Sequence, residues 1–306
     1  MSRITLKVDV DTLRGTLEGV PALQRMLDRH QARATFLFSL GPDNTGRALR
    51  RVFRPGFLKK VSRTSVVEHY GLKTLSYGVL LPGPDIGKKA AAEMRAIGTA
   101  GHETGIHTWD HVEWHDQVRT RDAAWTLQRM QQSYDRFGDV FGHAPATHGA
   151  AGWQMNETAI RQLDAWGMQY ASDGRGAAPY FMSIDGQPCK HMQLPTTLPT
   201  LDEILGVDGL TVDNVHEHLL GLTDPNRHGP RDHVFTLHAE LEGQKLAPIF
   251  DRLLTGWLQQ GHTLGTMGDY HATLTHQMLP IHPFAWGEIP GRSGELIVDL
   301  VNLPTV

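Results

Sequence analysis

Residues 3–11, Arg-Ile-Thr-Leu-Lys-Val-Asp-Val-Asp, decide how the fold begins. Apolar and polar side chains alternate here, and the apolar ones on one side are Ile4, Leu6, Val8 and Val10. This period of two is typical of a β-strand. The sequence therefore predicts a strand over residues 3–10 that delivers Asp11 at its end.

Strands and helices alternate along most of the remaining chain. Short apolar runs predict further strands at residues 34–40, 101–107, 168–172 and 233–238. Helical spacing of apolar residues predicts helices at residues 19–30, 88–97, 121–137, 159–166, 215–222 and 246–258. Strands that alternate with helices favour an α/β protein with a parallel sheet or barrel.

The composition limits the class of protein. The chain has 306 residues, enough for one large domain or two smaller ones. A hydrophobic content of 40% with 20% charged residues is typical of a globular protein. The net charge of −4 argues against a general nucleic-acid binder.

The compartment is indicated by the single cysteine, Cys189, which excludes an internal disulfide and fits a reducing environment. The first residues hold no apolar run of signal-peptide length, and no stretch approaches the ~20 apolar residues of a membrane span. We expect a cytosolic protein that can still contact a membrane.

Asp9 and Asp11 form the first candidate group. Because they are two residues apart on a strand, their carboxylates leave the same side of it. Two close carboxylates repel, and a cation beside them relieves the repulsion. One is then a metal ligand and the other a general base; the alternative is that Asp11 only caps the following turn.

Histidines form the second group. The chain has 18 of them, so about one His-x3-His pair is expected by chance. Two overlapping pairs occur, His107 with His111 and His111 with His115. Joined to Asp9 and Asp11, such a pair gives a two-histidine, one-aspartate site for one divalent metal, with positions left for water or substrate. The alternative is a solvated polar loop.

Further candidates also follow predicted strands. His238 ends the strand 233–238 and is placed to act as a general acid. Asp173 follows another strand and could orient His238; by itself it is a turn residue. The loop 150–153, Ala-Ala-Gly-Trp, offers backbone N–H donors to an oxyanion or is a plain turn. The C-terminal ends of strands are where α/β barrels carry their active sites.

One basic segment, residues 47–63, contains no acidic residue and mixes its cations with Phe, Leu and Val. It is either a solvated helix face or an interfacial segment that contacts anionic lipid headgroups. The residues that we expect at the lipid surface are Arg50, Arg51, Arg54, Phe57, Lys59 and Lys60.

The order of these motifs resembles the polysaccharide deacetylase (NodB-homology) family. The matching motifs are Asp-x-Asp at 9–11, His-Thr-x-x-His at 107–111, the glycine loop at 150–153, Ser-Asp at 172–173 and Leu-His at 237–238. In that family a Ser or Thr follows the first histidine, which selects His107 with His111. The resemblance implies a distorted (β/α) barrel of the polysaccharide deacetylase type and a metal-dependent amidohydrolase.

Carried over by motif, the resemblance makes Asp11, His107 and His111 the metal ligands and Asp9 the base. His238 becomes the acid, with Asp173 near it. Substrate or oxyanion contacts are assigned to Ala151, Gly152, Trp153, Arg175 and Glu240. The family's glycine-rich motif normally opens with an arginine that pairs with the base, and His148 stands near that place here.

Within the family, the chain resembles a branch that deformylates an arabinose carried on undecaprenyl phosphate. The stretches that carry this likeness are residues 8–21, 39–44, 107–111, 150–153, 172–177, 198–203 and 238–243. The branch implies removal of the formyl group from 4-deoxy-4-formamido-L-arabinose in the lipid A aminoarabinose (polymyxin resistance) pathway. The alternatives are an N-deacetylase of another sugar or peptidoglycan, and a catalytically inactive lipid or sugar-phosphate binder.

The same resemblance sets the expected organisation and partners. We expect a catalytic domain over residues 1–278 with a basic-apolar insertion at about 45–85, followed by an irregular tail over 279–306. One divalent ion is expected, and Zn, Mn, Co and Ni all suit the ligand set. The expected partners are the undecaprenyl-phosphate-linked sugar and the anionic cytoplasmic face of the inner membrane, with no nucleic acid.

Overall fold

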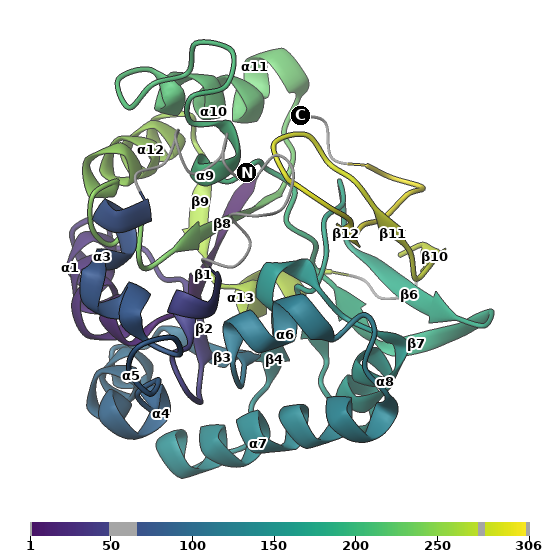
Figure 1. Cartoon of the computed structure of the whole chain (residues 1–306). Coiled ribbons are helices and arrows are strands. Elements are labelled where there is room, and N and C mark those ends of the chain that lie inside the picture. The colour runs from purple at the N-terminus through teal and green to yellow at the C-terminus, as the bar shows by residue number, and fades with distance from the viewer. Residues whose placement is uncertain (1, 49–65, 275–278, 304–306) are drawn as a thin grey trace.

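The computed structural model of the chain describes residues 2–48, 66–274 and 279–303. A large sheet occupies the middle of the molecule, and helices surround it (Figure 1). Ten strands belong to this sheet, and their order is β10-β6-β7-β5-β4-β3-β2-β1-β8, with β9 paired to β1. All of the pairings except β6 with β7 are parallel.

The strands of this sheet are β1 (Arg3–Val10), β2 (Thr35–Ser39), β3 (Glu103–Thr108), β4 (Thr147–His148), β5 (Tyr170–Ala171), β6 (Tyr180–Ile184), β7 (Gln187–Gln193), β8 (His233–His238), β9 (Thr263–Gly265) and β10 (Ile281–Pro283). A small antiparallel pair is formed by β11 (Trp286–Gly287) and β12 (Leu296–Ile297). Among the described residues, no pairing joins β10 to β8 at the two ends of the order.

The helices are α1 (Val20–Arg29), α3 (Val66–Ser76), α4 (Ile86–Lys89), α5 (Ala91–Thr99), α6 (His111–Gln117), α7 (Ala123–Phe141), α8 (Glu157–Ala165), α9 (Leu201–Ile204), α10 (Val215–Thr223), α11 (Pro225–His228), α12 (Ala247–Gln259) and α13 (Met267–His271). A π-helical turn over Gly15–Gly19 leads into α1, and a 3₁₀ turn covers Ala151–Trp153. No helix among the described residues has the length and apolar character that crossing a bilayer requires.

Strand β1 is buried on both of its faces. Its apolar side chains pack with α1 and α12 in the main hydrophobic core. The opposite face carries Thr5, Lys7 and Asp9, which are also buried. The alternation along β1 therefore separates an apolar core from a buried polar interior, and the candidate site lies on that polar face.

The sequence-based predictions of the fold are largely confirmed. The α/β class is confirmed by the parallel sheet and its surrounding helices. The predicted strands at residues 3–10 and 233–238 coincide with β1 and β8. The antiparallel pair β6–β7 was not predicted, because neither strand has a clear alternating pattern.

The expectation of an irregular tail is corrected by the structure. From residue 279 onward the chain forms β10, which extends the main sheet beside β6, and the β11–β12 pair. The segment that follows β12 also bridges Arg175 through Val298. These short elements depend on partners far away in the sequence, so local pattern could not predict them.

Candidate active site

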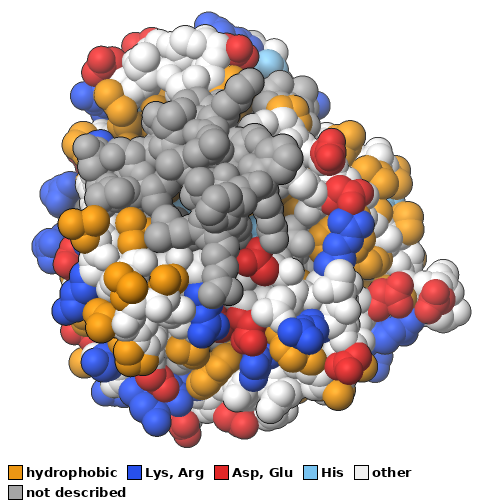
Figure 2. Space-filling view, viewed as in Figure 1, with side chains coloured by type: hydrophobic (Ala, Val, Ile, Leu, Met, Phe, Trp, Pro, Cys, Tyr) orange, Lys and Arg blue, Asp and Glu red, His pale blue; other side chains and the backbone are white. Residues whose placement is uncertain are grey.

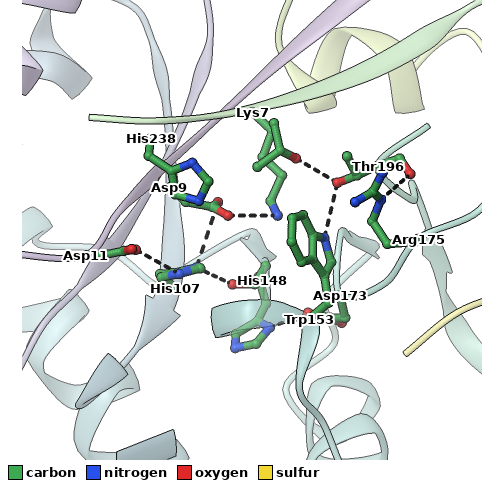
Figure 3. Close-up of polar contacts among 12 residues, drawn as sticks. Lys7, Asp9, Asp11, His107, His148, Trp153, Asp173, Arg175, Thr196 and His238 are labelled. Carbon is green, nitrogen blue, oxygen red and sulfur yellow. Dashed lines mark hydrogen bonds and ion pairs between the residues drawn. The ribbon is translucent and has the colours of Figure 1, made fainter. Parts of the chain in front are cut away.

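The candidate residues of β1 and β8 lie side by side. These two strands are parallel neighbours, and Asp9 is in register with His238. Strands β2 and β3 follow β1 in the sheet, and His107 lies near the end of β3. The ends of three strands therefore gather Asp9, Asp11, His107 and His238 in one place (Figure 3).

Asp11 faces two histidines. His107 Nε2 lies 3.2 Å from Asp11 Oδ1, and His111 Nε2 lies 3.4 Å from Asp11 Oδ2. The two imidazole rings are roughly parallel, with centroids 5.4 Å apart. Burial alone would raise the pKa of Asp11, but His111 and His107 together hold that pKa well below its usual value.

The donor atoms of this group suit a divalent metal ion. One oxygen of Asp11 and one nitrogen from each of His107 and His111 all lie within 4.8 Å of one another. Gly149 O accepts a hydrogen bond of 2.6 Å from His107 Nδ1, which orients the ring so that Nε2 faces Asp11. When Nε2 is unprotonated, a divalent cation between it and the carboxylate relieves the repulsion of the two acceptors.

The spacing supports the same interpretation. In a tetrahedral site with bonds of roughly 2.0 to 2.1 Å, neighbouring ligand atoms are roughly 3.3 Å apart. The two observed carboxylate–imidazole distances are close to that value. Asp11, His107 and His111 therefore fit a metal that keeps positions open for water and substrate.

The start of α6 fixes the position of His111. Asp110 caps this helix by accepting a 3.0 Å hydrogen bond from Glu113 N, and Asn44 Nδ2 donates to its other oxygen at 2.6 Å. His111 is the first residue of the helix, and His115 follows one turn later. The group of described residues that could hold a metal ion includes His111 with His107 and not His115, which favours the first of the two His-x3-His pairs.

Asp9 has a partner that the sequence reasoning missed. Lys7 Nζ forms a buried ion pair of 3.2 Å with Asp9 Oδ2, while Asp9 Oδ1 has no hydrogen-bond partner. Lys7 belongs to the same face of β1 as Asp9. Its position two residues before Asp9, which places both side chains on one face of the strand, was the available signal.

Glu240 lies beneath Asp11. Its Oε1 accepts hydrogen bonds from Asp11 N at 3.0 Å and from Thr12 N and Oγ1, both at 2.8 Å. Burial, followed by the nearby charge of Asp11, raises the pKa of Glu240 well above its usual value. Glu240 Oε1 therefore holds the backbone that carries Asp11, and the expected substrate contact of Glu240 stays a prediction.

His238 presents an unpartnered Nδ1 in the buried part of the site, and Figure 3 shows the ring beside Asp9. Its backbone N–H donates a 2.7 Å hydrogen bond to Glu242 Oε2. Burial raises the pKa of Glu242 to about 7, although His238 lowers it. Glu242 thus holds the backbone at the end of β8, and the sequence analysis did not predict this contact.

The expected pairing of Asp173 with His238 is wrong. The carboxylate of Asp173 accepts hydrogen bonds from His148 Nδ1 at 2.6 Å and from Gln193 Nε2 at 3.0 Å. Asp173 follows β5, and His148 lies on the neighbouring strand β4. His238 ends β8, which is separated from β4 by β3, β2 and β1. His148 therefore takes part in a buried pair, and Figure 3 shows its ring turned away from Asp9.

The glycine loop lies beside Lys7. Gly152 and Trp153 both have positive φ angles, 60° and 54°, and Trp153 Nε1 donates to Thr196 Oγ1 at 3.2 Å. A left-handed tryptophan is an uncommon conformation of the kind that clusters at functional sites. Within the described residues, the amides of Ala151 and Gly152 donate to no protein acceptor, so the expected oxyanion contacts remain predictions.

Arg175 is not placed to bind substrate directly, which corrects its assignment. Its side chain is only 1% exposed. Its donors bond to Thr196 O at 3.2 Å, to Leu198 O at 3.1 Å and to Glu203 Oε1 at 2.6 Å. The guanidinium therefore holds neighbouring segments together behind Trp153.

The residues predicted at the lipid surface lie outside the described residues. They are Arg50, Arg51, Arg54, Phe57, Lys59 and Lys60.

Comparison with known proteins shows the family to which the chain is similar. The polysaccharide deacetylase family matches residues 4–171. The curated relative from Shewanella sediminis, named as a 4-deoxy-4-formamido-L-arabinose-phosphoundecaprenol deformylase, is 36% identical over 83% of this chain and 81% of its own length. A relative of the same name from Wigglesworthia glossinidia brevipalpis is 29% identical over 92% of this chain and 96% of its own length.

A solved structure shares the fold. The crystal structure of a protein assigned as a polysaccharide deacetylase from Mycobacterium smegmatis matches with a TM-score of 0.61 and 17% identity, over 94% of this chain and 95% of that one. Fold and relatives together define a hydrolase that acts on an amide C–N bond. The chain belongs to the polysaccharide deacetylase family.

The metal site makes a direct prediction. Purified wild-type protein should bind one equivalent of Zn²⁺ or Co²⁺, and His111→Ala should weaken the affinity at least about tenfold because a ligand is lost. His115→Ala is the matched control, since its ring stacks on His111 at 6.3 Å without joining the ligand group. The metal content of each variant is measured after dialysis. If His111→Ala and His115→Ala lost the same amount of metal, the ligand set would be contradicted.

Proposed function

We propose that the protein removes the formyl group from 4-deoxy-4-formamido-L-arabinose linked to undecaprenyl phosphate. The observation that carries the proposal is the separation of two adjacent carboxylates: Asp11 faces His107 and His111, while Asp9 pairs with Lys7. The names of the two curated relatives supply the substrate. The product is the cationic amino sugar that the lipid A aminoarabinose pathway uses.

Asp9 is the general base in this proposal. Its Oδ2 is held by Lys7, and its Oδ1 is buried without a hydrogen-bond partner. An unpartnered carboxylate oxygen beside the ligand group can accept a proton from the attacking water. Lys7 positions the carboxylate through the buried ion pair.

His238 completes the proton transfers. It is in register with Asp9 on the neighbouring strand, and its Nδ1 has no partner. A histidine in this place can protonate the sugar nitrogen as the C–N bond breaks, which releases formate and the free amine. Water enters and formate leaves, so the reaction needs no other reactant.

The remaining groups stabilise charge. A divalent ion bound by Asp11, His107 and His111 would polarise the formamide carbonyl and lower the pKa of water at this position. The amides of Ala151 and Gly152 are free to donate to the carbonyl oxygen as negative charge develops on it. The buried surroundings strengthen these interactions.

We further propose peripheral contact with an anionic membrane, where the lipid-linked substrate lies. The described part of the insertion presents the exposed aliphatic residues Leu72, Val79, Leu80 and Leu81. Figure 2 shows hydrophobic side chains gathered on the face that carries α3 in Figure 1. Exposed aliphatic groups beside a basic sequence segment are typical of interfacial binding.

The substrate assignment predicts which product is released. Wild-type protein loaded with metal should release formate from the formamido-arabinose lipid. The corresponding acetamido lipid should react at least about tenfold more slowly, because its additional methyl group must fit a site built for formyl. His111→Ala should release little of either product. Faster release of acetate would point to a deacetylase, and full activity of His111→Ala would contradict the site.

Membrane contact is tested separately with vesicles that contain phosphatidylglycerol. Replacing Arg50, Arg51 and Arg54 by Ser should weaken binding roughly 100-fold, from about 1 kcal/mol for each cation near an anionic surface. A charge-matched control replaces Arg25, Arg29 and Arg252, which are exposed on α1 and α12. Flotation that is unchanged in the first triple variant, or equally reduced in both, would contradict the assignment.

A further inference from the structure

Three cationic side chains surround the indole of Trp153. Lys7 Nζ lies 5.4 Å from the ring centroid, and the guanidinium carbons of Arg175 and Arg292 lie at 5.0 Å and 4.3 Å. Figure 3 shows Trp153 standing between Lys7 and Arg175. Lys7 pairs with Asp9, the proposed base, and Arg175 joins neighbouring segments of the chain. The function of Arg292 remains to be assigned.

Arg292 is held rigidly from the C-terminal tail. Its Nε donates a 2.8 Å hydrogen bond to Glu203 Oε1, the same oxygen that binds Arg175. Gly291 precedes it with a φ of 80°, and a Cβ there would lie 2.7 Å from Glu203 O. A glycine is therefore required for the tail to bring Arg292 against Glu203.

Glu203 is a strong anchor for this side chain. Its carboxylate is 1% exposed and closes a capping box with Thr200 at the start of α9. Burial would raise the pKa of Glu203, but Arg175 and Arg292 lower it below its usual value. The carboxylate is thus held charged, in an orientation that fixes the guanidinium of Arg292.

The outer edge of Arg292 is available for a ligand. Its two Nη groups donate to no other described residue, and the side chain is 15% exposed. Arg175, by contrast, has all three nitrogens engaged and is 1% exposed. Of the two guanidinium groups on Glu203, Arg292 is therefore the one with free donors.

Arg292 also lies close enough to the reacting groups to contact the same sugar. It stacks on the indole that Lys7 approaches, and its charge interacts with that of Asp9. Burial opposes its charge, but Asp202, Glu203 and Asp9 raise the pKa of Arg292 above its usual value. The guanidinium is thus a fixed cation, and the indole of Trp153 lies between it and the Lys7–Asp9 pair.

We propose that Arg292 binds the phosphate of the lipid-linked sugar, with its Nη groups as donors to the phosphate oxygens. This inference rests on the proposed function, since that substrate carries a phosphate on the same arabinose ring as the formamide. A planar guanidinium with two parallel donors matches the geometry of phosphate oxygens. Arg292 then sets the distance between the phosphate and the formamide, and selects a sugar phosphate over a neutral glycoside.

The test pairs a protein variant with a substrate variant. Formate release is measured in neutral detergent from the lipid-linked substrate and from the methyl glycoside of the same formamido sugar, which lacks phosphate. Arg292→Gln should lower kcat/KM for the phosphate substrate about 10- to 100-fold, the range for a lost charged hydrogen bond. It should leave kcat/KM for the methyl glycoside unchanged, and Arg292→Lys should recover part of the loss.

Arg119→Gln is the matched control. Arg119 also stacks on a tryptophan, Trp286 at 4.5 Å, and pairs with a tail carboxylate, Glu295 at 2.5 Å. The Arg119→Gln variant should keep the wild-type kcat/KM for both substrates. The proposal would be overturned if Arg292→Gln lowered kcat/KM equally for both substrates or lowered it for neither. It would also be overturned if kcat/KM fell only when phosphatidylglycerol vesicles are present.

A binding measurement separates this inference from the proposed function. Undecaprenyl phosphate should bind Arg292→Gln about 10- to 100-fold more weakly than wild type in neutral detergent, whereas undecaprenol should bind both equally. Absence of formate release by wild type would refute the proposed function and leave this comparison intact. Equal affinity of undecaprenyl phosphate for the two proteins would refute the role of Arg292.

Discussion

Asp9 on β1 and Asp11 directly after it are buried carboxylates that repel each other, and the surrounding structure gives each of them its own partners. Asp9 has Lys7 on the same strand face, and Asp11 has two histidines brought by β3 and α6. For Asp11, the two histidines hold the pKa of the carboxylate well below its usual value although burial raises it. In the proposed mechanism this separation gives them different chemistry, because Asp11 would be a metal ligand while Asp9 keeps an oxygen without a hydrogen-bond partner.

Much of this arrangement could be predicted from the sequence, because β1 and β8 have clear local patterns and their ends carry reactive residues. Spacing alone placed Asp9 and Asp11 on one face. The choice between His111 and His115 needed either the family motif or the helix start at His111, which the structure shows. The roles of Lys7 and Glu240 were missed because they depend on which face of the strand is buried and on a contact across more than 200 residues.

The errors have a common physical origin in long-range pairing. Asp173 was assigned to His238 because both lie at the ends of predicted strands and the family resemblance implies that they are near each other. The strand order instead makes His148 the neighbour of Asp173. The tail was expected to be irregular because its strands are short, yet β10 and β12 are stabilised by β6, β11 and the segment around Arg175. That ordered tail brings Arg292 to Trp153, so a segment beyond the residues matched by the family model lies against the candidate site.

The division of labour between the two aspartates is tested most directly by comparing Asp9→Asn with Asp11→Asn for metal content and formate release in the same preparations. Asp9→Asn should retain one equivalent of metal and lose about 10²- to 10⁴-fold in rate, the range for removal of a general base. Asp11→Asn should lose the metal itself. Loss of metal from Asp9→Asn, or an Asp11→Asn variant that keeps its metal, would contradict the account.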